Sequence, residues 1–188
     1  YGVPGVAVAL IENGNPVWSA GYGYADVQAR TPMTEDTICR AESISKAVTA
    51  WGVMRLVEQQ RLDPGEPVET YLDEWELPES SYREADVTVA HLLSHLSGFP
   101  LGTIGPPTEY APGGPTPPFQ EFVLSEASLV QEPGTGFIYS DVGFNLLQLV
   151  VEEVTGEAFD SYMRREVLVP LGMTDSDYEW RASYAPRI

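Results

Sequence analysis

The chain has 188 residues, of which 43% are hydrophobic and 20% charged, and this balance excludes a disordered, collagen-like or coiled-coil protein. Its formal net charge of −18 would repel nucleic acid and anionic membranes, so neither is an expected partner. No stretch approaches the roughly 18 apolar residues that an integral membrane span requires.

Two counts single out individual residues. Cys39 is the single cysteine, so it cannot form an internal disulfide or support a metal site, and we expect a small buried hydrophobe there rather than a reactive thiol. Lys46 is the single lysine, and every other basic residue is an arginine. A lysine can give up its proton whereas a guanidinium effectively cannot, so Lys46 is a candidate for chemistry.

The first thirty residues predict a β-hairpin. The stretch Val3–Ile11 is apolar and rich in β-branched residues, Glu12–Asn15 carries turn signals, and Pro16–Tyr24 resumes the strand pattern. A lone hairpin is marginal in water, so these strands must join others or lie against helices. No later segment is as clearly a strand.

The pattern then turns helical. Apolar residues recur at three- and four-residue steps from Ser43 until Leu62–Gly65 ends the run, which predicts a long amphipathic helix. The acid-rich stretch 66–86 is interpreted as a solvated surface without chemistry. Thr88 can cap a short helix that runs to Leu96 and is closed by Gly98.

The second half begins with a long loop. Residues 98–118 hold seven prolines and five glycines, too many breakers for helix or sheet, and such a loop is either the rim or lid of a site or a linker. Asp141 can start a helix over Val142–Thr155 that ends at Gly156, and a further helix is expected from about residue 157 to 168.

Ser43 and Lys46 form a Ser-x-x-Lys tetrad at the start of the first long helix. The three-residue spacing places the hydroxyl and the amine on one helix face, and the free N–H groups of the helix N-terminus favour an anion beside the serine. The alternative is an N-capping serine followed by a surface lysine.

A nucleophilic serine needs a base, and the chain offers two kinds. His91 and His95 lie four residues apart but lack the glutamate of a zinc-protease helix, so packing roles are favoured for both, although a histidine-based triad stays open. Tyr139 is the other candidate, because a nearby ammonium would favour ionisation of its phenol. Alone, Tyr139 would be interpreted as a half-buried aromatic before a helix.

Taken together, the motifs resemble the serine β-lactamase and penicillin-binding-protein superfamily, in particular its branch of class C β-lactamases, D-aminopeptidases and esterases. Five segments carry this resemblance in the family's order: Gly2–Ala9, Ala41–Lys46, His91–Gly98, Pro133–Thr135 leading into Tyr139–Asp141, and Pro170–Met173.

The resemblance implies a role for each site residue. Ser43 would be the acylated nucleophile, Lys46 the amine that activates it, and Tyr139 the general base, with water resolving the acyl-enzyme. Asp141 would occupy a substrate-binding position where lactamases usually have Asn, and the extra anion should hold Lys46 protonated. The Tyr-Ser-Asp order is more similar to esterase-type members than to lactamases.

The resemblance also implies a fold. We expect an α+β domain in which an antiparallel sheet is flanked by helices: 1–37 as a sheet-lobe hairpin, 38–180 as a mainly helical lobe, and 181–188 leading toward missing strands. The family's third motif, Lys or His followed by Ser/Thr and Gly, is absent after Tyr139. The chain is therefore interpreted as the N-terminal part of a longer catalytic domain.

Two functional hypotheses follow. The first is a serine hydrolase that needs no metal and no cofactor and forms an acyl-enzyme with a small-molecule ester, amide or β-lactam. The alternative is a non-catalytic peptide-binding module, or a piece that requires a complementary C-terminal segment or chain. The chain opens at Tyr1 without a leader pattern, so secreted, periplasmic and cytoplasmic locations all remain open.

Overall fold

A computed structural model describes residues 2–73, 76–102 and 118–187, and it divides into two compact units. The sheet unit comprises the chain up to Glu42 together with the residues from Glu179 onward, and the helical unit comprises Ser43–Tyr178. The protein is α+β, as expected. No helix among the described residues is long and apolar enough to cross a membrane.

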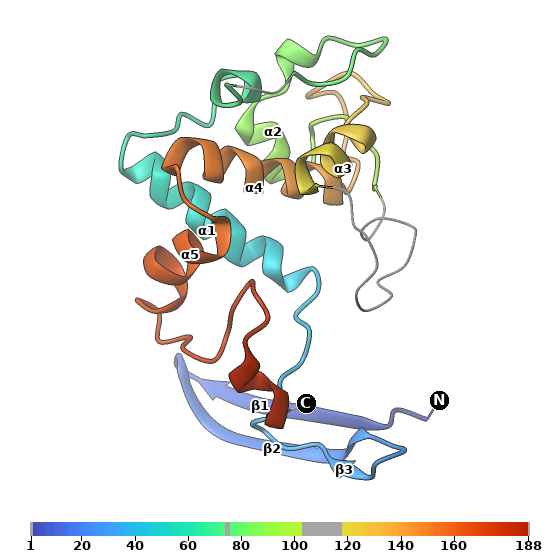
Figure 1. Ribbon diagram of the computed structural model, residues 1–188, viewed down its shortest axis with the longest axis vertical. Coiled ribbons are helices and arrows are strands. Elements are labelled where there is room, and N and C mark those ends of the chain that lie inside the picture. Colours follow the sequence, from blue (N-terminus) through green and yellow to red (C-terminus); the bar gives the residue numbers. More distant parts are fainter. Residues whose placement is uncertain (1, 74–75, 103–117, 188) are drawn as a thin grey trace. The chain divides into compact units, whose positions relative to one another are not determined.

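The sheet unit is built on the predicted hairpin. Strands β1 (Gly5–Glu12) and β2 (Asn15–Asp26) pair antiparallel, and the short β3 (Thr31–Pro32) adds to the far edge of β2 (Figure 1). Asn13 and Gly14 connect the strands with φ values of 51° and 77°, as a tight hairpin turn with matching twist requires. Strand β3 was not predicted, because it has only two residues, Thr31 and Pro32, and these are too few to show a strand pattern.

The last described turn of the chain returns to the sheet unit. The 3-10 turn Ala182–Arg187 is held there because Ile38 donates its N–H to the carbonyl of Arg187 at 2.7 Å, while the Arg187 side chain donates to the carbonyl of Asp36 at 2.9 Å. Cys39 follows directly after this contact. It is exposed rather than buried, so the expectation of a small buried hydrophobe is wrong: its thiol donates to the carbonyl of Thr37 at 3.7 Å instead of packing into an apolar core.

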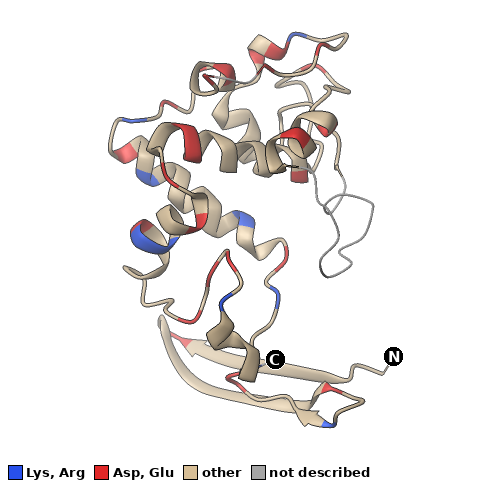
Figure 2. Cartoon of the chain, viewed as in Figure 1, with Lys and Arg blue, Asp and Glu red and all other residues tan. Residues whose placement is uncertain are grey.

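The described part of the helical unit contains five α-helices (Figure 1): α1 (Ile44–Glu58), α2 (Val89–Ser94), α3 (Phe119–Glu126), α4 (Asp141–Thr155) and α5 (Phe159–Met163), which continues into a π-helical turn (Arg164–Leu168). Helix α4 is the centre of the core, since it contacts each of the other four helices. Its inward face is buried and apolar, with Val142, Leu146, Leu147, Leu149, Val150 and Val151. Acidic residues are spread along the elements of this unit, with few basic residues between them (Figure 2).

Several helix ends differ from the predicted ones. Helix α1 stops at Glu58 because Gln60 takes a left-handed conformation (φ 58°), before the Leu62–Gly65 breaker is reached. Helix α4 is capped by Ser140, whose hydroxyl accepts the N–H of Gly143, so Asp141 is its first residue rather than its cap. The expected single helix over 157–168 changes pitch at Arg164.

The long predicted loop is described only in part. Residues 103–117 lie outside the described residues, so most of the predicted 98–118 loop is outside them too. Helix α3 begins directly after Pro118 and was not predicted, because proline-rich sequence runs up to its first residue.

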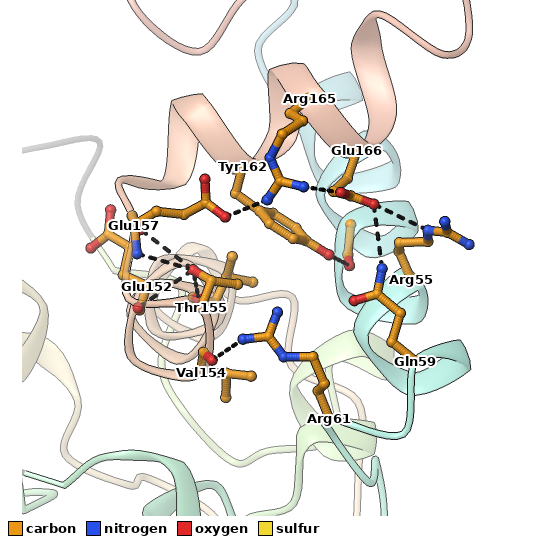
Figure 3. Close-up of polar contacts among 12 residues, drawn as sticks. Arg55, Gln59, Arg61, Glu152, Val154, Thr155, Glu157, Tyr162, Arg165 and Glu166 are labelled. Atoms are coloured by element: carbon orange, nitrogen blue, oxygen red, sulfur yellow. Dashed lines mark hydrogen bonds and ion pairs between the residues drawn. The ribbon is translucent and has the colours of Figure 1, made fainter.

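Helices α1 and α5 pack at a glycine. A Cβ atom on Gly52 would clash with the sulfur of the buried Met163, and the hydroxyl of Tyr162 donates to the Gly52 carbonyl at 2.9 Å. Burial raises the pKa of Tyr162 to about 12, so its phenol stays a donor. Charged side chains extend this contact, with Glu166 joined to Arg55, Gln59 and Arg165 (Figure 3). The helix that begins beside Ser43 is thus anchored along its second half.

We expect Gly52→Ala to destabilise the fold. Alanine gains about 1 kcal/mol in helix propensity over glycine, but overpacking a filled core costs about 1–3 kcal/mol, and the buried Met163 has little room to withdraw. Urea unfolding should show a lower midpoint for this variant. In the double variant Gly52→Ala/Met163→Ala the combined loss should be smaller than the sum of the two single losses, and a midpoint that rises in Gly52→Ala would contradict this packing.

Candidate active site

Ser43 occupies the N-cap position of α1 without capping the helix. Its backbone is helical (φ −64°, ψ −12°), and its side chain makes no bond to the N–H groups of the first turn. The hydroxyl of a capping serine normally accepts a hydrogen bond from one of these N–H groups. Here the hydroxyl is exposed and free to hydrogen-bond to other side chains, which argues against the interpretation of Ser43 as an ordinary cap.

Lys46 reaches Ser43 from one turn along α1. Its Nζ donates to Ser43 Oγ at 3.3 Å and forms an ion pair with Asp141 Oδ1 at 2.5 Å. Burial alone would lower the pKa of Lys46, but the hydrogen bonds and charges of Asp141 and Tyr139 outweigh it, and the pKa is raised. Lys46 is therefore held as an ammonium, as expected from the aspartate beside it.

Tyr139 approaches the same hydroxyl from the segment before α4. Its Oη donates to Ser43 Oγ at 2.7 Å, and Lys46 Nζ lies 4.8 Å from the centre of its ring. Hydrogen bonds from Lys46 and then from Ser43 lower the pKa of the Tyr139 phenol. Of the two groups that contact Ser43 Oγ, the phenol is thus the one whose surroundings favour loss of its proton, whereas those of Lys46 favour keeping it.

A ladder of backbone bonds holds the Tyr139 segment in place. The segment after α2 pairs with the approach to α4: Gly134 donates to the carbonyl of Leu96 at 2.8 Å, Ile138 to that of His95 at 3.0 Å, and Asp141 to that of Leu101 at 2.8 Å. The buried hydroxyl of Ser140 also donates to the carbonyl of Pro100 at 2.7 Å. Tyr139 and Asp141 are therefore placed by paired chain rather than by a free loop.

The structure brings together all four residues singled out in the sequence, namely Ser43, Lys46, Tyr139 and Asp141. His91 is not among them: its Nδ1 accepts the N–H of Thr88 in a capping box at the start of α2. His95 does join the group, since its ring lies 4.4 Å from that of Tyr139. Sequence reasoning favoured packing roles for both histidines and left a histidine-based triad open, and the spacing between His91 and His95 gave no sign of the difference between them.

The fold and this arrangement define a protein of the β-lactamase class. The sequence matches the Beta-lactamase family over residues 1–187, and the chain belongs to that family.

Three known proteins illustrate the relationship. Protein flp of Staphylococcus aureus (strain NCTC 8325 / PS 47) is 24% identical over 177 residues, 94% of this chain and 35% of that protein. The D-amino acid amidase of Ochrobactrum anthropi SV3, solved with L-phenylalanine, is 30% identical with a TM-score of 0.77, covering 92% of this chain and 46% of the amidase. EstCE1, described as a hydrolase with promiscuous acyltransferase activity, is 28% identical with a TM-score of 0.76, over 90% and 47% of the two chains. This chain thus spans between a third and a half of the length of these relatives.

We expect Asp141→Asn to lower the pKa of Lys46, because the substitution removes the anion that holds the ammonium in its charged form. Since Lys46 is the only lysine, a chain labelled with ¹³Cε-lysine gives one signal, and its titration reports this group directly. Asp160→Asn, on α5, is the matched control and should leave the titration unchanged. An unaltered Lys46 titration in Asp141→Asn would show that the ion pair does not set its charge.

Proposed function

We propose that this chain carries the nucleophile and general base of a serine hydrolase that forms an acyl-enzyme with an ester or amide. The observation that carries the proposal is the contact of one serine hydroxyl with two activating groups, Tyr139 Oη at 2.7 Å and Lys46 Nζ at 3.3 Å. A nucleophile within hydrogen-bond reach of its base, which is in turn oriented by a third group, is the signature of nucleophilic catalysis.

The proposed reaction begins with the phenol ionised. The Lys46 ammonium stabilises the Tyr139 phenolate, which takes the Ser43 proton as Oγ attacks the substrate carbonyl. The neutral phenol then returns that proton to the leaving alcohol or amine. In the second half, the Tyr139 phenolate takes a proton from water as the water oxygen attacks the acyl carbonyl. The phenol then returns that proton to Ser43 Oγ as the bond to the acyl group breaks, and the acid is released.

Oxyanion stabilisation is only half supplied by the helical unit. The free N–H groups at the start of α1 lie where negative charge would develop beside Ser43. The second donor of an oxyanion hole would belong to the third motif, which the sequence lacks. Because loss of one such donor commonly costs ~10²–10³ in rate, we propose that full turnover requires a complementary C-terminal segment or chain, and that both units described here belong to one catalytic domain with it.

The substrate class is proposed from the site and from the relatives. A hydrolase with acyltransferase activity and a D-amino acid amidase are among the similar structures, which supports esters and amides as substrates. Asp141 stands where lactamases have Asn, so a β-lactam is expected to react less readily than an activated ester.

The test is intact-mass analysis after exposure to a fluorophosphonate and, separately, to a penicillin. The fluorophosphonate should add one phosphonyl group, with loss of fluoride, at a peptide that contains Ser43, faster than the penicillin adds its acyl group. A folded chain that gives no adduct, even when joined to the remainder of a longer relative, would favour the alternative of a binding module. Because this chain covers only 35–47% of the relatives named above, the experiment must include the longer chain.

A further inference from the structure

His95 contacts Tyr139 and both of its neighbours in the chain, and the proposed reaction does not yet use these contacts. It ends α2 in a left-handed conformation (φ 59°), and its partly buried ring lies 4.4 Å from the ring of Tyr139 and 5.2 Å from that of Phe144. Its Nδ1 accepts the N–H of Ser140 at 3.1 Å, and its carbonyl accepts the N–H of Ile138 at 3.0 Å. One residue thus holds the chain on both sides of Tyr139 and packs on the side chain between.

We propose that His95 is a positioning residue of this site, whose neutral imidazole keeps Tyr139 Oη within hydrogen-bond distance of Ser43 Oγ. Its effect on catalysis rests on the proposed function, whereas the contact itself does not. A displacement of about 1 Å at a reacting group can cost as much as ~10²-fold in rate, so a loose Tyr139 would be a poor base.

The imidazole must be neutral for this role, since only an unprotonated Nδ1 can accept the Ser140 N–H. Burial and then the charge of Lys46 lower the pKa of His95, while Asp141 acts in the opposite direction. In the described residues, the charged and titratable groups that face the ring are Lys46 from α1, Asp141 from α4, and Tyr139 itself. At neutral pH, the site therefore favours the neutral imidazole of His95, whose Nδ1 accepts the N–H of Ser140.

Protonation of His95 at acid pH should break the hydrogen bond between its Nδ1 and the N–H of Ser140. The lowered pKa means that stability due to the neutral ring is present above the ordinary histidine pKa of about 6.5 and is lost as the pH falls through the lower value of the folded protein. Below that value Nδ1 carries a proton directed at the Ser140 N–H, two donors face each other, and a second positive charge lies near Lys46.

Three variants separate the acceptor, the ring and the titration. His95→Asn retains an acceptor near the position of Nδ1, tolerates the left-handed backbone and does not titrate. His95→Phe keeps a ring against Tyr139 but removes the acceptor. His91→Gln is the matched control, because His91 makes a similar Nδ1 contact to a backbone N–H at the start of α2, and Gln can take its place in a capping box.

Fluorophosphonate acylation is measured between pH 4.5 and 8.5, with ¹H–¹⁵N spectra of the same proteins. In the wild type and in His91→Gln, the acylation rate should fall with pH more steeply below the pKa of His95 than above it, by up to a further tenfold per pH unit beyond the fall that protonation of Tyr139 causes, and the Ser140 amide signal should titrate with the His95 ring. His95→Asn should lose the added steepness and the amide response while keeping the fall due to Tyr139, and His95→Phe should acylate up to ~10²-fold more slowly at pH 8 while remaining folded.

A Ser140 amide signal that ignores the titration of His95, or a His95→Phe variant that acylates at the wild-type rate, overturns the inference. If the amide responds as expected but the wild type is not acylated, even when joined to the remainder of a longer relative, the positioning contact stands and the proposed function fails. If the wild type is acylated while the amide is silent, the proposed function stands and the role of His95 does not.

Discussion

We expect Ser43→Ala to abolish acylation by a fluorophosphonate and to leave the helical unit folded. The loss should be complete because the substitution removes the proposed attacking oxygen, whereas most substitutions near a site only slow the reaction. The fold survives because Ser43 does not cap α1. A cap exchanged for alanine costs about 0.5–2 kcal/mol, and here there is no cap bond to lose. Intact mass gives the first result and urea unfolding the second.

Ser45→Ala is the matched control for this prediction. It removes a hydroxyl from the same turn of α1, two residues away, and should be labelled as fast as the wild type. If Ser43→Ala still gains the adduct, or if Ser45→Ala loses it, the nucleophile has been assigned to the wrong residue.

We expect Tyr139→Phe to slow acylation by ~10²–10⁴, the range that a well-placed general base commonly contributes. The variant removes the oxygen that lies 2.7 Å from Ser43 Oγ but keeps the ring that packs against His95, so the geometry of the segment is retained. The rate constant of adduct formation, followed by mass over time, measures this loss. Because Lys46 lowers the pKa of the phenol, the wild-type rate should also keep rising with pH until that lowered pKa is passed, and the variant should lose this rise.

Tyr71→Phe serves as the control, since it removes a phenol of the helical unit whose oxygen accepts the N–H of Asp63 at 2.8 Å. Its acylation rate should be that of the wild type. A Tyr139→Phe variant that reacts within a few-fold of the wild type would assign the role of base to another group.

The predictable parts of this protein are those that neighbours in sequence determine. The hairpin follows from strand pattern and the Asn13–Gly14 turn, and the Ser43–Lys46 contact follows from one turn of helix. Tyr139 and Asp141 were brought into the site by resemblance, since no local rule joins them to α1.

What the sequence did not predict depends on distant partners. The exposure of Cys39 reflects what lies around it rather than its own residue type. Ser140 caps α4 instead of Asp141 because its hydroxyl is also fixed by the carbonyl of Pro100, 40 residues earlier. The role of His95 depends on a bond across 45 residues, so spacing on its own helix could not distinguish it from His91.

The nucleophile and its base are 96 residues apart in the chain, which has a consequence for synthesis. Ser43 leaves the ribosome long before Tyr139, and domains form from the N-terminus onward as the chain emerges. Until the later segment has docked, Ser43 is an ordinary alcohol beside an ammonium, with no base to take its proton. If Ser43 and Tyr139 act as proposed, a nascent or half-folded chain should not react with acyl donors, and labelling of Ser43 would report completed folding of the helical unit.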